Sequence, residues 1–180
     1  MPRVLLDGVG SAGLSEGLSA ALHGRGRVPL QVRAEGFWRP AGERFTHGRQ
    51  DWLAFRDGWL DAGALRREVL EADGTWLPAL WDVGRDRSAR AGRLVLPERG
   101  VLLVDGMFLQ GLGLPAELVV HIALSPAALL RRGVPAWQLE AFTSYDELVA
   151  PRDNADVLVR AEDPLRPAVR WPSAPAPPTR

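Results

Sequence analysis

A glycine-rich segment near the start of the chain has the residue types and spacing of a phosphate-binding site. The apolar run at 4–6 (Val-Leu-Leu) is followed at 7–15 by Asp-Gly-Val-Gly-Ser-Ala-Gly-Leu-Ser. Glycines allow backbone N–H groups to approach a phosphate closely, and a helix that begins after them adds the positive end of its dipole. We therefore expect the following residues to bind phosphate: Gly8, Val9, Gly10, Ser11, Ala12, Gly13, Leu14 and Ser15.

Two known patterns fit this segment and predict different ligands. Residues 8–15 match the nucleoside triphosphate pattern G-x-x-x-x-G-K-[ST] at every fixed position except Leu14, which replaces the lysine. The first pattern favours ATP with Mg²⁺, and it makes the Ser15 hydroxyl a metal ligand. The glycines also spell G-x-G-x-x-G, the dinucleotide pattern, with Glu35 about twenty residues on as the acidic ribose partner. The second pattern favours an NAD(P)-dependent oxidoreductase.

No other lysine can replace the missing one, because all 22 Lys and Arg residues of the chain are arginines. A charge-assisted bond to phosphate is worth about 1.5–3 kcal/mol. Losing one donor to the transition state costs on the order of 10²–10³ in rate. We therefore expect nucleotide binding to suffer less than phosphoryl transfer, and only an arginine could compensate.

Two carboxylates follow predicted strands, where open α/β sheets place their sites. Glu35 ends the second strand, and it is either a general base or a solvated, ion-paired carboxylate. Asp105 ends the apolar run at 101–104. A carboxylate at the end of a buried strand is costly unless it binds Mg²⁺ or pairs with arginine. We therefore expect Asp105 to be a metal ligand.

Hydrophobic patterning predicts the elements that position these residues. Strands are expected at about 3–7, 30–35, 101–104, 118–124 and 155–159, and helices at about 13–23, 51–72 (split at its glycines), 126–132 and 137–149. The alternation predicts a parallel sheet covered on both faces. We expect a domain over 1–163 and a proline-rich tail over 164–180 that is extended or disordered.

Composition excludes several classes of function. The net charge is zero, so neither nucleic acid nor a membrane surface is an expected partner. The chain has no cysteine, which excludes disulfides and thiolate chemistry. No apolar run is long enough to span a membrane. We expect a cytoplasmic protein that binds small molecules, with homo-oligomer formation left open.

The order of several segments resembles the uridine kinase-like branch of the P-loop kinases. These segments are the glycine loop, Glu-Gly-Phe-Trp-Arg-Pro at 35–40, Val-Leu-Leu-Val-Asp-Gly at 101–106, and a late set formed by Tyr145, Val149, Pro151 and Ala-Asp-Val at 155–157. The resemblance covers roughly residues 3–160 and implies a three-layer α/β/α P-loop NTPase-type fold with a five-stranded parallel sheet. It also implies ATP-dependent phosphorylation of a nucleoside or similar small alcohol, with Glu35 as the catalytic base.

The same resemblance implies a nucleoside-like substrate and names the side chains that contact it. The tryptophans among them could stack on a base. The implied substrate-binding residues are Phe37, Trp38, Arg39, His47, Trp81, Asp82, Arg131 and Arg132, and the implied metal ligands are Ser15 and Asp105.

The chain departs from the family pattern within the site itself. Leu14 replaces the lysine, Glu35 is longer than the usual aspartate, and Thr46 stands where a substrate-binding aspartate is expected. These departures favour an alternative function as a nucleotide-binding pseudokinase. Because Arg39, Arg131 and Arg132 lie near the loop in the resembling fold, we expect one of them to offset the missing lysine.

Overall fold

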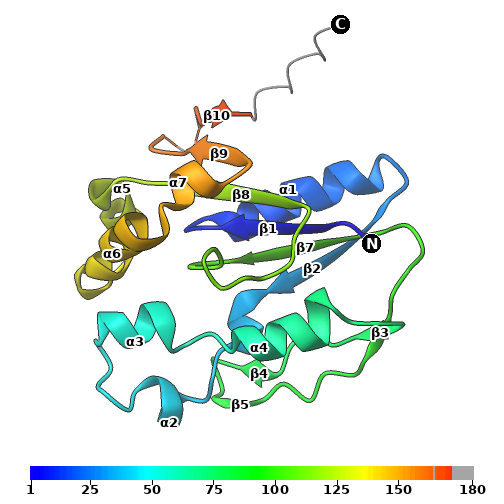
Figure 1. The fold of residues 1–180 in the computed structure, drawn as a ribbon, viewed down its shortest axis with the longest axis horizontal. Coiled ribbons are helices and arrows are strands. Elements are labelled where there is room, and N and C mark those ends of the chain that lie inside the picture. Colours follow the sequence, from blue (N-terminus) through cyan, green and yellow to red (C-terminus); the bar gives the residue numbers. More distant parts are fainter. Residues whose placement is uncertain (164, 172–180) are drawn as a thin grey trace, which may run out of the picture.

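The computed structural model describes residues 1–163 and 165–171, and its centre is a six-stranded sheet (Figure 1). The strands lie in the order β10-β9-β8-β1-β7-β2. Five are parallel, and β10 is antiparallel to β9. Their bounds are β1 (Arg3–Asp7), β2 (Val28–Arg33), β7 (Gly100–Gly106), β8 (Leu118–Ala123), β9 (Val157–Arg160) and β10 (Ala168–Arg170).

The strand order brings the carboxyl ends of the first three long strands to one edge. In the register of the sheet, Asp7 lies opposite Gly106, and Arg33 lies opposite Asp105. Here β7 separates β1 from β2, whereas the dinucleotide-binding fold places its second strand beside its first. The NAD(P)-dependent alternative is therefore wrong for this fold.

The helices begin and end largely where patterning predicts. The segment at 51–72 divides at Gly58, directly after Asp57, and resumes at Ala62, whereas Gly63, the other expected break, lies inside the second helix. The Ser125 side chain accepts a hydrogen bond from the Ala128 N–H and so caps the helix that begins at Pro126. The bounds are α1 (Ser11–His23), α2 (Ala41–Arg44), α3 (Trp52–Asp57), α4 (Ala62–Leu65), α5 (Pro126–Arg131), α6 (Leu139–Val149) and α7 (Pro151–Asn154), with 3₁₀ turns η1 (Ala34–Phe37) and η3 (Ala136–Gln138) and a π turn η2 (Arg66–Leu70).

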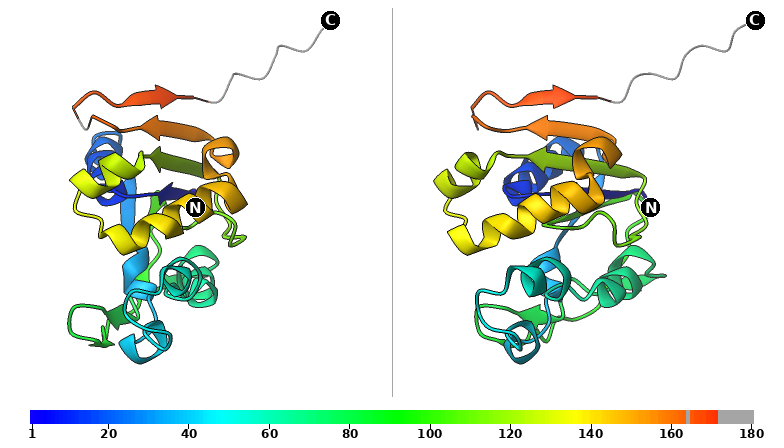
Figure 2. Two further views of the ribbon diagram at one scale, coloured as in Figure 1. Left: turned by 90° about the vertical axis from the view of Figure 1, so that its left-hand side faces the viewer. Right: turned by 60° about the vertical axis from the view of Figure 1, so that its left-hand side comes forward.

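The two faces of the sheet are covered by different helices, which gives three layers (Figure 2). On one face, Leu18 and Leu22 of α1 pack against the buried side chain of Leu6. On the other face, Leu65 of α4 and Val69 of η2 pack with buried side chains of β1, β2 and β7. This is the α/β/α arrangement that the sequence predicts.

Residues 73–97 contain two small antiparallel strand pairs. Strand β3 (Thr75–Trp76) pairs with β6 (Leu94–Val95), and β4 (Trp81–Asp82) pairs with β5 (Arg87–Ser88). The Leu80 N–H donates to the Gly36 carbonyl oxygen at 2.8 Å. This bond holds the β4–β5 hairpin beside the turn that follows β2.

The expected five-stranded sheet has a sixth strand, which comes from the predicted tail. Strand β10 pairs with β9 because an extended segment satisfies the free N–H and C=O groups of an edge strand. Residue 164 and residues 172–180 of the predicted tail lie outside the described residues. Within the described part of the chain, no helix has the length and apolar character needed to cross a membrane.

Candidate active site

The glycine loop is a tight turn, Gly8–Gly10, between β1 and α1. The φ angles of Gly8 and Gly10 are +120° and +93°, in the region that favours glycine. A Cβ atom at Gly8 would lie 2.6 Å from the carbonyl oxygen of Ile122. Helix α1 begins at Ser11, earlier than the expected start at 13, so the loop is shorter than the nucleoside triphosphate pattern predicts.

Several N–H groups of this turn remain available to an anion. The Gly8 N–H donates to the Gly106 carbonyl oxygen, and the Ser11 N–H donates to that of Gly8. No acceptor among the described residues takes the N–H groups of Val9, Gly10, Ala12 or Gly13. Because these groups lie at the positive end of α1, the turn can bind a phosphate group.

Leu14 lies on the sheet side of α1 and leaves the turn open. It packs with Leu18 and Leu22, one and two helical turns further on, against the core around Leu6. It does not line the cavity at the glycine loop. The position of the missing lysine therefore points into the core, because α1 has already begun there.

Ser15 also lies inside the first part of α1, away from the site. Its side chain is 1% exposed, and its hydroxyl accepts a hydrogen bond of 3.1 Å from Nε2 of Gln31 on β2. The hydroxyl that lies at the site is that of Ser11, which lines the loop cavity. The geometry thus gives no support to Ser15 as a metal ligand.

Two cavities meet beside the glycine loop. One, the loop cavity, has a volume of about 310 Å³ and lies over residues 8–12. The other, the hairpin cavity, has a volume of about 520 Å³ and lies between α1, the end of β2 and the β4–β5 hairpin. Both are lined by Ala12, Arg33, Glu35 and Asp105.

Asp105 stands at the junction of the two cavities. It is 5% exposed, and no hydrogen-bond or ion-pair partner of its carboxylate is found in the described part of the chain. Burial raises the pKa of Asp105 to about 6, with Glu35 and Glu16 adding to the effect and Arg33 opposing it. A carboxylate that is desolvated and unpaired in this way fits the expected metal ligand.

Glu35 lies across the junction on the turn η1, where it is exposed to both cavities. Trp38, from the same segment, lines the loop cavity. Trp81 of the hairpin lines the other cavity, and its Nε1 donates to Asp86 at 3.0 Å. Arg132, which follows α5, lines the loop cavity. The structure thus brings these predicted residues together around one junction.

Other predicted substrate residues do not line either cavity. Phe37 is 1% exposed and belongs to the core. Asp82 is paired with Arg85, which lowers the pKa of Asp82 below its usual range. Arg39 pairs with Glu43, Arg131 faces Glu162, and His47 is exposed on a loop. The family resemblance places these five residues at the site, but in the structure their side chains lie in the core, in ion pairs or on the surface, outside both cavities.

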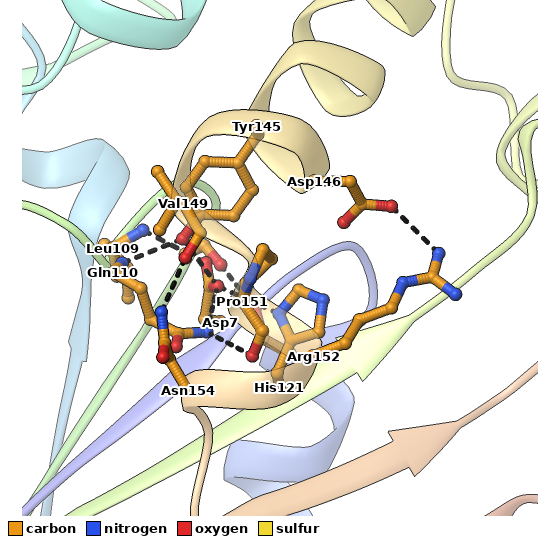
Figure 3. Close-up of polar contacts among 12 residues, drawn as sticks. Asp7, Leu109, Gln110, His121, Tyr145, Asp146, Val149, Pro151, Arg152 and Asn154 are labelled. Carbon is orange, nitrogen blue, oxygen red and sulfur yellow. Dashed lines mark hydrogen bonds and ion pairs between the residues drawn. The ribbon is translucent and has the colours of Figure 1, made fainter.

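A buried polar network, which the sequence patterns did not predict, lies beneath the glycine loop (Figure 3). Asp7, the last residue of β1, is fully buried. Its carboxylate accepts hydrogen bonds from the N–H of Leu109, Nε2 of Gln110 and the hydroxyl of Tyr145. Nδ1 of His121 lies 3.0 Å from the same carboxylate.

The network holds Tyr145 in its protonated form. Burial and the negative charge of Asp7 raise the pKa of Tyr145 well above its usual range. Tyr145 in turn accepts a hydrogen bond from the Gln110 N–H at 2.9 Å. The available sequence signal was an aspartate placed directly between a buried strand and a glycine turn.

Comparisons with known proteins agree on the fold. No family model matches the sequence, and no curated protein matches it significantly. A Bacillus stearothermophilus protein described as a possible uridine kinase has a TM-score of 0.71 at 19% identity, over 87% of each chain. A protein of Silicibacter sp. TM1040, provisionally assigned as a fructose transport system kinase, has a TM-score of 0.59 at 23% identity, over 86% of this chain and 80% of its own.

Phosphoribulokinase from Rhodobacter spheroides is also similar in fold. Its TM-score is 0.55 at 12% identity, over 88% of this chain and 69% of its own. All three likenesses are under 25% identical in sequence, so they show similarity of fold. The chain therefore has the fold of the P-loop kinases.

Proposed function

We propose that the protein transfers a phosphoryl group from ATP to a hydroxyl of a nucleoside or similar small alcohol. The observation that carries this proposal is the junction of the two cavities at Glu35 and Asp105. A kinase must hold two substrates with their reacting groups in contact and in line. The loop cavity is the site for ATP, and the hairpin cavity is the site for the alcohol.

The residues present fit ATP and fit Mg²⁺ in part. Free N–H groups at Val9, Gly10 and Ala12 suit a polyphosphate. Asp105 suits Mg²⁺, which is bound through one or two carboxylates together with waters and substrate phosphates. When bound, Mg²⁺ offsets the charge that develops on the transferring phosphoryl group. In the described part of the chain, no group of three metal-ligating side chains exists.

Glu35 is the proposed general base. It reaches both cavities from η1, so its carboxylate can accept the proton of a hydroxyl held in the hairpin cavity. Trp81 supplies an aromatic surface on the wall of the same cavity. Gly36 and Ala79 form part of that wall, and they lie so close together that a Cβ atom on Gly36 would be 2.9 Å from the Cβ atom of Ala79. These groups orient an alcohol toward the junction.

A specific observation favours a second candidate function, nucleotide binding without phosphoryl transfer. Leu14 is part of the core, and the Ser15 hydroxyl is bonded to Gln31. Both positions normally act on the phosphates or the metal in a G-x-x-x-x-G-K-[ST] loop. Losing such a contribution lowers the rate by on the order of 10²–10³ while backbone donors preserve binding.

Calorimetric titration with Mg²⁺–ATP, followed by a phosphoryl-transfer assay with a panel of nucleosides and sugars, tests the two candidates. We expect binding, and slow transfer that falls further in Glu35→Gln. Glu43→Gln, which changes an exposed glutamate outside both cavities, is the matched control. Binding without any turnover supports the second candidate, and absence of binding contradicts both.

A further inference from the structure

The carboxylate of Asp86 joins the tip of the β4–β5 hairpin to α2. Its Oδ1 accepts hydrogen bonds from the Ala41 N–H at 2.9 Å and from Nε1 of Trp81 at 3.0 Å. The φ angle of Asp86 is +45°, in the left-handed region that residues other than glycine rarely adopt. The turn of the hairpin therefore presents this carboxylate to two donors that lie far apart in sequence.

Helix α2 is a firm anchor for the Asp86 carboxylate. Arg44 of this helix is 5% exposed, and its Nη2 lies 3.9 Å from Oδ1 of Asp86. Its guanidinium carbon lies 4.9 Å from the ring centroid of Phe45 and 5.0 Å from that of Trp59, so aromatic rings hold it in place. The two hydrogen bonds, and then the charge of Arg44, hold the pKa of Asp86 below its usual range. The carboxylate is therefore ionised and fixed to α2.

Trp81 is the member of this group that reaches the hairpin cavity. It lines that cavity, whereas Asp86 and Arg44 line neither cavity. A ring on an open cavity wall has alternative rotamers, and the bond from Nε1 to Asp86 selects one of them. The base of the hairpin is held separately, because the Leu80 N–H donates to the carbonyl oxygen of Gly36. Removing the Asp86 side chain would therefore release the Trp81 ring without detaching the hairpin.

We propose that Asp86 is a positioning residue, which fixes the indole of Trp81 against an alcohol bound in the hairpin cavity. This inference rests on the proposed function, since it takes this cavity as the site of the alcohol. It adds that a residue outside both cavities controls the affinity for that substrate. Without the Asp86 side chain the substrate must itself immobilise the ring, and this entropic cost lowers its affinity.

Calorimetric titration of Asp86→Gly with uridine, cytidine and fructose tests this role, since glycine adopts a positive φ without strain. For any of these alcohols that the unaltered protein binds, we expect the dissociation constant to rise about 3- to 10-fold, the cost of ordering one side chain. The constant for Mg²⁺–ATP should not change. Asp86→Asn keeps an oxygen that can accept both bonds, so its affinity for the alcohol should stay within about twofold of the original.

Arg90→Gly is the matched control for the change to glycine. Arg90 is exposed in the same segment, has a φ of +50° and lines neither cavity. We expect this variant to bind the alcohols and ATP as the unaltered protein does.

The same substitution in a Trp81→Phe background shows whether Asp86 acts through the indole. Phenylalanine keeps an aromatic ring but has no N–H for Asp86, so Asp86→Gly should cost no further affinity there. Hydrogen exchange of the Trp81 indole N–H, followed by NMR without ligand, should become faster in Asp86→Gly and stay unchanged in Arg90→Gly. The Trp81→Phe spectrum identifies that resonance.

Equal alcohol binding by Asp86→Gly and the unaltered protein overturns the role of Asp86 and leaves the proposed alcohol site standing. A loss of the same size in the Trp81→Phe background also overturns it, because the effect would then not pass through the indole. So does an Asp86→Asn variant that binds as weakly as Asp86→Gly, since the charge would then act and not the hydrogen bond. Failure of the unaltered protein to bind any of the three alcohols contradicts the proposed function, and the inference fails with it.

Discussion

At the scale of single residues, the environment of Asp105 makes the stability of the protein depend on pH. Burial stabilises the neutral form, and the nearby carboxylates of Glu35 and Glu16 act in the same direction. The folded-state pKa of about 6 exceeds the ordinary value of 3.8. Ionised Asp105 therefore lowers the free energy of unfolding above pH 6, and this cost disappears below pH 4.

We expect Asp105→Asn to stabilise the protein at pH 7.5, since it removes that cost. The gain should be about 1–2 kcal/mol, because solvent in the cavities screens the charge. It should shrink as the pH falls from 6 to 4, and urea denaturation across this range measures it. The exposed Asp73→Asn is the control. A gain that grows as the pH falls would contradict the burial argument.

Leu14→Lys tests where the side chain at position 14 points. A lysine that restores a phosphate contact would raise the phosphoryl-transfer rate. The packing of Leu14 against the core predicts the opposite result, a loss of about 1–3 kcal/mol in the free energy of unfolding with no gain in rate. Leu148→Lys, at a position that is 71% exposed on α6, should cost far less. A faster and equally stable Leu14→Lys variant would show that α1 begins later than described.

At the scale of elements, the start of α1 sets the shape of the phosphate site. Gly10 is the N-cap residue and has a positive φ, whereas Gly13 lies within the helix. A Cβ atom at Gly10 would meet Arg132, and one at Gly13 would meet nothing within 4 Å. Gly10 and Gly13 therefore have different structural requirements.

We expect opposite effects of the same substitution at these two positions. Gly10→Ala should destabilise the protein by more than about 1 kcal/mol, because alanine is strained at positive φ and displaces the guanidinium of Arg132. Gly13→Ala should stabilise it by about 0.4–1 kcal/mol, because alanine favours a helix. Thermal unfolding of both variants without ligand measures the difference. A destabilising Gly13→Ala would indicate a wider loop.

At the scale of the whole molecule, the Asp7 network joins elements that are far apart in sequence. The first strand reaches β8 through His121, α6 through Tyr145 and the segment after β7 through Gln110. These contacts lie directly beneath the glycine turn, since Asp7 precedes Gly8 (Figure 3). The network therefore couples the base of the phosphate site to the helices on the side of α6.

Asp7→Ala should destabilise the protein strongly, by about 3–5 kcal/mol, because its buried donors would lose their acceptor. Tyr145→Phe removes one donor and should cost about 1.5–3 kcal/mol, the range for a bond to a charged group. Chemical denaturation followed by two optical probes measures both losses and the cooperativity of unfolding. Equal losses in the two variants would mean that Tyr145 alone accounts for the stabilisation.

Much of the fold follows from local sequence. Short apolar runs end in charged or glycine residues, and Ser125-Pro126 marks a helix start, so strands and helices could be placed to within a few residues. The strand β10 could not be placed, because its pairing with β9 depends on a free sheet edge and not on its own apolar content. Its residues are exposed, so no hydrophobic pattern marks them.

The sequence by itself determined the glycine turn, the carboxylates at the strand ends and the absence of lysine, because these depend on residue type and local spacing. The tertiary structure alone decided which side chains reach the site. Leu14 and Ser15 turn inward because α1 begins at Ser11. Arg132 reaches the turn because α5 and β9 place it there. Side-chain direction depends on where a helix starts and on what packs against it, and neither is encoded in the spacing of a motif.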